Sequence, residues 1–255
     1  MAKYARNISN KWAKHEALRR HSALSAHMPE TRRMTRTSLR AMLGKYRMVY
    51  VKPVVGSLGK GVMRVESAGR GLRYQAGVHI RKHANYASGY AAILKETRGR
   101  PYMVQRGIRL SRYGGRPFDL RVVVQRMPRT DWTVTGIAGR VAHPRKIVTN
   151  GSQGGTIYSV NRLLPGGAAL ERRMRKLGLQ AARRLHRVYP GIVELGLDLA
   201  VDRNRRLWII EANTRPDPCP FSKLPNRGML NRIVRYGAAW GIRYKLHCMK
   251  ARRGR

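Results

Sequence analysis

The chain has 255 residues, a length that suits one large domain or two small ones, and its 42% of hydrophobic residues can form a buried core. It carries 54 Lys and Arg against 12 Asp and Glu, and this net charge of +42, spread along the chain rather than confined to one basic arm, attracts polyanions. No stretch approaches the roughly 18 consecutive apolar residues that span a bilayer, and no apolar leader follows Met1, so we expect neither a membrane span nor a secretory signal peptide.

The two cysteines give a prediction about redox state. Cys219 and Cys248 are far apart in the sequence and match no metal-ligand spacing. We therefore expect reduced thiols, as in a cytosolic protein.

Residues 1–47 form a basic, helix-prone lead-in. Residues 1–28 contain few apolar positions, and Thr31 follows Pro29 where it could cap a second helix. The apolar residues of that helix would be Met34, Leu39, Met42, Leu43 and Tyr46.

A glycine-rich loop follows the first predicted strand. The strand 48–51 is followed directly by Lys52. The loop spans 56–61, and a second strand covers 62–65. Glycines let a backbone approach a phosphate closely and point N–H groups at it. Because a strand rather than a helix follows, the loop is a flap and not a Walker A loop. The alternative is an ordinary hairpin with a long turn.

A short apolar strand, 102–105, leads into the segment Gln105–Ile108. Such a segment can contact the edge of a purine through its backbone while an apolar side chain lies on the base. The alternative is a plain strand end. Upstream, 71–78 reads as a strand and 86–95 as a helix.

The strand 119–124 begins with two charged residues on one face. Asp119 and Arg121 are two positions apart, so their side chains point the same way. Asp119 could accept hydrogen bonds from a ribose, and Arg121 could bind a carboxylate or phosphate through two N–H groups. The alternative is an exposed ion pair of little energetic value. Asn150 precedes a loop with three glycines, which suits either a phosphate or substrate loop or a generic surface loop.

The segment 165–188 is predicted to be a long amphipathic helix. Its apolar stripe indicates core packing. Its other face is basic, which is usually a solvated surface but here could contact a polyanion. The basic positions are Arg172, Arg173, Arg175, Lys176, Arg183, Arg184 and Arg187.

Two apolar runs, 195–201 and 207–212, predict a hairpin that contains three oxygen ligands. If the turn centres on 203–204, Asp198 lies opposite Ile209 and one diagonal step from Glu211, with Asn213 on the same face. Two carboxylates and an amide suit Mg²⁺, which takes one or two carboxylates together with substrate phosphates. The alternative is a hairpin with a polar end and no metal.

The ordered motifs of the chain resemble the ATP-grasp proteins, and among them the endospore coat-associated YheC/YheD-like group. The resemblance covers about residues 10 to 220, through N-K-W, P-E-T, V-K-P-V-V-G-S-L-G-K-G-V, V-Q-R-G-I, R-P-F-D-L-R-V, T-N-G-S-Q-G-G and E-L-G-L-D-L…W-I-I-E-A-N-T-R-P. It implies an α+β fold with two α+β subdomains and ATP between them. The sequence departs from the ligase members in one respect, because the matching motifs start almost at once and we expect the pre-ATP-grasp domain to be lacking. The small subdomain would be 48–108 and the large one 109–220, followed by a basic segment, 221–255.

The resemblance also implies roles for residues around the ATP phosphates. Lys52 and Lys11 would bind the phosphates, with Lys14 as the alternative to Lys11. The flap over the phosphates would consist of Gly56, Ser57, Gly59, Lys60 and Gly61.

The remaining implied contacts concern the adenosine, the metal and the reacting group. The adenine hinge would be Gln105, Arg106, Gly107 and Ile108. Asp119 would approach the ribose, and Asn150 and Arg121 would contact phosphate or the acyl intermediate, with Arg121 and Lys52 as the catalytic residues. Asp198, Glu211 and Asn213 match the ligands of Mg²⁺, with two ions expected.

The function implied is a carboxylate–amine ligase that uses ATP and Mg²⁺ to form an acyl phosphate. The basic surface suggests an acidic small molecule, peptide or polymer as substrate. One alternative is a spore coat-associated structural or binding protein that keeps the fold, and another is a nucleic-acid binder. We expect a cytoplasmic protein that is associated with spores.

Overall fold

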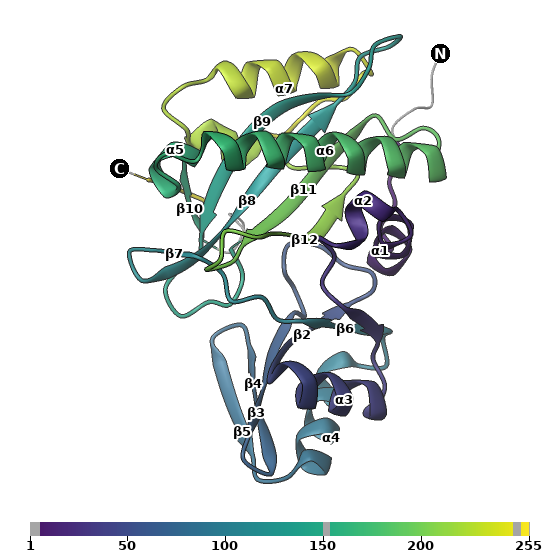
Figure 1. Cartoon of the computed structure of the whole chain (residues 1–255), viewed down its shortest axis with the longest axis vertical. Helices are drawn as coiled ribbons and strands as arrows, with labels where there is room; N and C mark the ends of the chain where they lie inside the picture. Colours follow the sequence, from purple (N-terminus) through teal and green to yellow (C-terminus); the bar gives the residue numbers. More distant parts are fainter. Residues whose placement is uncertain (1–5, 150–153, 247–250, 255) are drawn as a thin grey trace. The chain divides into compact units, whose positions relative to one another are not determined.

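The structure, a computed structural model, describes residues 6–149, 154–246 and 251–254. Its chain forms two compact units, each with its own sheet and helices (Figure 1). The larger unit takes its residues from 1–28, 110–143 and 149–255, and the smaller unit consists of 29–109 and 144–148. This confirms the α+β class. The division differs from the four predicted segments, because the lead-in is shared between the units and the basic C-terminal segment belongs to the larger one.

The smaller unit contains a six-stranded antiparallel sheet with the order β1-β6-β2-β3-β4-β5. Its strands are β1 (Thr31–Arg33), β2 (Met48–Pro53), β3 (Met63–Ala68), β4 (Gly71–Ala76), β5 (His79–His83) and β6 (Tyr102–Arg106). The predicted strand that carries Lys52 is β2, and it lies between β6 and β3 in the sheet interior.

Two helices, α3 (Arg36–Tyr46) and α4 (Tyr86–Thr97), pack on this sheet. α3 begins after Thr35, whose side chain accepts a hydrogen bond from the N–H of Ser38, while the Ser38 hydroxyl accepts one from the N–H of Thr35. The prediction that Thr31 caps this helix is wrong. Thr31 pairs with Gln105 in the sheet, and its hydroxyl donates to the carbonyl of Pro29.

The larger unit contains a second sheet with the order β12-β11-β8-β9-β10-β13, and β7 pairs with β8. Its strands are β7 (Arg112–Tyr113), β8 (Arg116–Gln125), β9 (Thr133–Val141), β10 (Thr156–Tyr158), β11 (Glu194–Val201), β12 (Leu207–Asn213) and β13 (Arg252–Arg253). Neighbours are antiparallel except β10 and β13, which are parallel. The predicted strand 119–124 lies within β8, and the predicted hairpin is β11 and β12.

Helices cover both faces of the larger sheet (Figure 1). They are α1 (Lys11–Arg19), α2 (Ser22–Ser25), α5 (Val160–Leu163), α6 (Ala168–Val188), the 3₁₀ helix η2 (Cys219–Lys223) and α7 (Gly228–Ala238). Because side chains alternate along β8, Val122 and Val124 pack toward α6, whereas Val123 packs toward η2 and α7. α6 approaches closely through Gly178, where a Cβ would lie 3.0 Å from Val124. The face that holds Val123 also carries the charged residues described below.

The larger unit also decides the prediction about the cysteines. Cys219 is disulfide-bonded, which corrects the expectation of a reduced thiol there, and Cys248 lies outside the described residues. Over the ranges that the structure describes, no helix combines the length and apolar character needed to cross a membrane.

Candidate functional site

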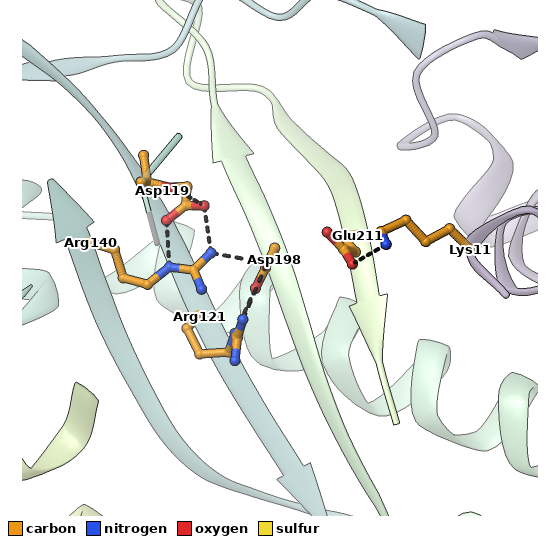
Figure 2. A network of polar contacts seen from close by, with 7 residues as sticks. Lys11, Asp119, Arg121, Arg140, Asp198 and Glu211 are labelled. Carbon is orange, nitrogen blue, oxygen red and sulfur yellow. Dashed lines mark hydrogen bonds and ion pairs between the residues drawn. The ribbon is translucent and has the colours of Figure 1, made fainter. Parts of the chain in front are cut away.

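Five charged side chains gather on the face of the larger sheet that points away from α6. Asp119 and Arg121 come from β8, Arg140 from β9, Asp198 from β11 and Glu211 from β12. Figure 2 shows them on neighbouring strands, with Lys11 of α1 next to Glu211. Sequence reasoning singled out four of these five residues, and the fold brings those four together.

The register of the hairpin differs from the predicted one. Asp198 lies directly opposite Glu211, not opposite Ile209, which pairs with Leu199 instead. Between the pairs Asp198–Glu211 and Leu199–Ile209, β11 advances by one residue and β12 by two, so Ile210 is the extra residue of a bulge in β12 that contributes to this shift. Directly opposed residues have closer side chains than diagonal ones, so the bulge brings the two carboxylates nearer than predicted.

Asp198 is buried and paired with two arginines. Its Oδ1 accepts from Nε of Arg121 at 2.6 Å, and its Oδ2 accepts from Nη2 of Arg121 at 3.2 Å and from Nη2 of Arg140 at 3.0 Å. Burial by itself raises the pKa of Asp198, but the two guanidinium groups together outweigh it, so the pKa lies below its ordinary value. Asp198 is therefore a carboxylate held in the charged form.

Arg140 links Asp198 to Asp119, and sequence reasoning missed it. Its Nε and Nη2 donate to the two oxygens of Asp119 at 2.8 and 2.6 Å, and the Thr149 hydroxyl donates to Oδ2 at 2.6 Å. Burial opposes the charge on Arg140, yet both aspartates raise its pKa above the ordinary value. Both Asp119 oxygens thus already accept hydrogen bonds, and a ribose contact by Asp119 stays a prediction that competes with them.

Gly196 makes room for Arg121. A Cβ at this position would lie 3.3 Å from Cδ and Nη1 of Arg121 and 2.7 Å from Cβ of Pro216. The arginine side chain thus lies over the glycine, between its own strand and Pro216. Any larger residue at 196 would compete with the guanidinium for this space.

Lys11 and Lys14 reach the same carboxylates from α1. The helix begins after Asn10, whose Oδ1 accepts from the N–H of Ala13 at 3.0 Å. Lys11 Nζ is 3.7 Å from Glu211 Oε1. Lys14 is buried, and its burial lowers the pKa to about 8 although Glu211 acts in the opposite direction. Of the two predicted lysines, Lys11 is the one that forms an ion pair with a metal-ligand candidate.

The predicted metal ligands fit Mg²⁺ as a donor set. Glu211 and Asn213 are two positions apart on β12 and share a face, and Asp198 is opposite Glu211. Among the described residues, no group of three or more His, Cys, Asp and Glu could hold a metal ion. A Mg²⁺ ion here would therefore depend on the Asn213 amide and on oxygens from outside the protein, which is how Mg²⁺ is usually held beside phosphates.

In the smaller unit, the structure brings Lys52 and Gln105 together. Lys52 Nζ donates to Gln105 Oε1 at 2.6 Å, and Gln105 Nε2 donates to the Thr31 hydroxyl at 3.2 Å. Lys52 is buried in β2 and lies 5.7 Å from the ring centre of Tyr50. The predicted phosphate lysine thus contacts the first residue of the predicted hinge.

The glycines of the predicted flap have conformations that other residues rarely adopt. The φ angles of Gly56, Gly59 and Gly61 are 146°, 70° and 73°. Gly61 is also confined by Tyr102, whose hydroxyl oxygen would lie 2.7 Å from an added Cβ. Ser57 and Lys60 are exposed. The segment is therefore a tight, glycine-dependent turn, and its contact with phosphates stays a prediction.

Two backbone N–H groups of the predicted adenine hinge already donate hydrogen bonds within the protein. The N–H of Arg106 donates to the carbonyl of Glu30 at 2.8 Å, and the N–H of Gly107 donates to the carbonyl of Met48 at 3.0 Å. An adenine contact would have to use other backbone groups of the segment, which ends at the buried Ile108. Asn150, the last predicted contact, lies outside the described residues.

Comparison with known proteins gives one family model and curated relatives. The family model described as "YheC/D like ATP-grasp" matches residues 3–239. The chain is 28% identical over 236 residues to the endospore coat-associated protein YheD of Bacillus subtilis (strain 168), an alignment that covers 86% of this chain and 51% of YheD. The chain thus spans about half the length of this relative.

Two solved structures share the fold at low sequence identity. The D-alanine–D-alanine ligase from Coxiella burnetii aligns with a TM-score of 0.54 at 13% identity, covering 89% of this chain and 56% of that one. The biotin carboxylase domain of Hydrogenobacter thermophilus 2-oxoglutarate carboxylase, solved with MgADP, ADP and bicarbonate, aligns with a TM-score of 0.57 at 16% identity, covering 93% and 46%.

Proposed function

Because the chain belongs to the YheC/D-like ATP-grasp family, we propose that it is a ligase that uses ATP and Mg²⁺ to activate a carboxylate as an acyl phosphate for attack by an amine. The observation that carries the proposal is the placement of Asp198 opposite Glu211, with Arg121 and Lys11 on either side. Two carboxylates and two cations on one sheet face suit a metal–phosphate group.

Each residue has a proposed task in this reaction. Asp198, Glu211 and Asn213 would hold Mg²⁺, which when bound neutralises phosphate oxygens and orients them. Lys52 and Lys11 would neutralise the phosphates of ATP. Arg121, held in place by Asp198, would stabilise the charge that develops as phosphate is transferred to the carboxylate.

The proposed chemistry needs no side-chain nucleophile. The attacking groups, first the carboxylate and then the amine, both come from substrates, so the protein contributes positioning and charge. Arg140 is a positioning residue in this scheme, because it contacts Asp119 and Asp198 and is itself buried.

The substrate we propose is an acidic small molecule, peptide or polymer. The net charge of +42 would raise its local concentration and speed its association. The name of YheD favours a second candidate function, binding in a spore coat without turnover. We propose a cytoplasmic protein that associates with the spore, and fractionation of sporulating cells would show it in the coat if that is right.

Turnover of ATP tests the ligase proposal. We expect the wild-type protein to hydrolyse or transfer phosphate from ATP only with Mg²⁺, and faster when an acidic acceptor and an amine are both present. Glu211→Gln should lower the rate at least about 100-fold, because an interaction made mainly in the transition state is lost.

The matched control is Glu171→Gln, which removes a half-buried carboxylate that pairs with Arg175 within α6. This variant should keep the full rate. Wild-type protein that binds ATP but never turns it over with any acceptor would support the coat-binding function instead. Equal rates for wild type and Glu211→Gln would refute the ligase proposal.

A further inference from the structure

The outer surface of α6 carries a stripe of cations that no part of the proposed ligase reaction uses. Arg172, Lys176, Arg183 and Arg187 are spaced by four, seven and four residues, which places them within a sector of roughly 60° on a helix of 3.6 residues per turn. All four are exposed. From Arg172 to Arg187 the stripe is about 22 Å long at 1.5 Å per residue.

Most of this charge has no counter-charge in the part of the chain that the structure describes. Arg183 pairs with Asp131 and Arg175, beside the stripe, with Glu171. Among the described residues, Arg172, Lys176 and Arg187 contact no carboxylate. Nine of the twelve acids of the chain form ion pairs over the described ranges, and the other three, Glu194, Asp202 and Asp217, accept hydrogen bonds. No carboxylate is left over for the stripe.

A hollow lies next to the stripe, lined by residues of α6 and of the segment around α2. It has a volume of about 240 Å³ and is lined by Ala23, His27, Arg173, Lys176, Leu177 and Gln180. Arg173 and Lys176 place two cations on it, and Gln180 adds an amide. The hollow and the stripe share Lys176, so they form one continuous basic surface.

The chemistry of this surface distinguishes among anionic partners. α6 carries no Phe, Tyr or Trp, and the only large apolar residue exposed on it is Val188 at its end. A polypeptide partner gains most of its binding energy from apolar and aromatic anchors, and single-stranded nucleic acid from base stacking. A duplex backbone needs neither, because its binding depends on phosphate neutralisation.

We propose that the outer face of α6 binds the phosphate backbone of double-stranded nucleic acid without reading its sequence. A duplex presents one charge per 1.7 Å of its axis, so about 13 phosphates lie along the length of the stripe. This face of the unit points away from Asp198 and Glu211. The surface is thus separate from the residues proposed for ATP.

The test measures binding of a fluorescent 20-base-pair DNA duplex by anisotropy between 50 and 200 mM salt. The stripe variant is Arg172→Gln, Lys176→Gln and Arg187→Gln, since Gln has a helix propensity close to those of Arg and Lys. We expect the affinity at 100 mM salt to fall at least about tenfold and the slope of log K against log salt to flatten by up to about 2.7.

The control removes three charges elsewhere, through Arg70→Gln, Lys82→Gln and Lys95→Gln, all exposed in the smaller unit and free of ion pairs in the described structure. It should lose less than about threefold. Equal losses in both variants would overturn the proposal, because net charge alone would then explain binding. So would tighter binding of polyglutamate of matched charge, or no duplex binding at 50 mM salt. The stripe variant should keep its affinity for ATP, which separates this proposal from the ligase proposal.

Discussion

At the scale of single residues, Asp198 and Arg140 have ion-pair partners that could not be predicted from the sequence. Asp198 was predicted as a metal ligand, but its two arginine partners come from strands far away in the chain. Arg140 is the single charged residue of the strand 133–141, and that contrast is the signal by which it could have been found. Removing one member of such a buried pair typically costs about 3 to 5 kcal/mol. We therefore expect Arg140 to matter for stability as well as for the site.

Gly196→Ala tests whether Arg121 needs the space above this glycine. The new Cβ would lie 2.7 Å from Pro216 and 3.3 Å from Arg121, so one of them has to move. We expect the free energy of unfolding to fall by about 1 to 3 kcal/mol, measured by urea denaturation, and the affinity for ATP to fall with it.

The control for this substitution is Gly44→Ala in α3. A Cβ at position 44 meets nothing within 4 Å, and the residue is helical, in the last turn of α3. The free energy of unfolding should rise by about 0.5 to 1 kcal/mol. If Gly196→Ala behaves in the same way, Arg121 does not depend on the space over Gly196.

At the scale of elements, a buried carboxylate joins β11 to the segment that follows α7. The Tyr244 hydroxyl donates to Glu194, and Gln125 Nε2 donates to the same hydroxyl oxygen at 3.0 Å. Burial raises the pKa of Glu194 to about 7, although Tyr244, Gln125 and Arg215 act in the opposite direction. Glu194 is thus a protonated group at mildly acidic pH.

This pKa predicts a pH dependence of stability. Because the pKa of Glu194 is about 7 in the folded protein and 4.5 ordinarily, the folded state binds the extra proton between these values. The free energy of unfolding then falls as pH rises from about 4.5 to 7, by on the order of 3 kcal/mol from this group. Glu194→Gln stays neutral, so this contribution should vanish.

The measurement is the difference in unfolding free energy between wild type and Glu194→Gln at several pH values, from urea denaturation. In that difference, titrations common to both proteins cancel. Glu171→Gln, at a half-buried position within α6, should show no comparable trend. A flat difference for Glu194→Gln would mean that Glu194 is charged in the folded protein at pH 5.

Elements with a strong local pattern were predictable, and those fixed by distant contacts were not. The apolar periodicity of residues 168–188 and the paired runs of β11 and β12 identified these elements correctly. The bulge at Asp198 has no local marker, because Asp198 also pairs with Arg121 on β8 and the register depends on both neighbours. The helix cap at Thr35 was missed because Thr31 stands at a similar distance from the apolar run. In the structure Thr31 belongs to strand β1, and Thr35 is the cap.

At the scale of the whole molecule, the sequence motifs and the net charge support different predictions, the fold and the class of partner. The ATP site that we propose uses Lys52, Asp198 and Glu211, whereas the net charge of +42 is spread along the chain and lies mostly outside these residues. Motifs predicted the fold because their order along the chain is specific. The charge predicted only a class of partner, since charge counts carry no information about where the cations lie.

The most direct test of the central proposal is the affinity of the protein for ATP, measured by isothermal titration calorimetry with Mg²⁺ and with EDTA. We predict binding that requires Mg²⁺, at least about tenfold weaker binding (about 1.4 kcal/mol) for Lys52→Met and for Glu211→Gln, and unchanged binding for the exposed-lysine control Lys82→Gln. Binding that is indifferent to Mg²⁺, or equally tight in Lys52→Met and Glu211→Gln, would contradict the assignment of these residues to ATP and its metal.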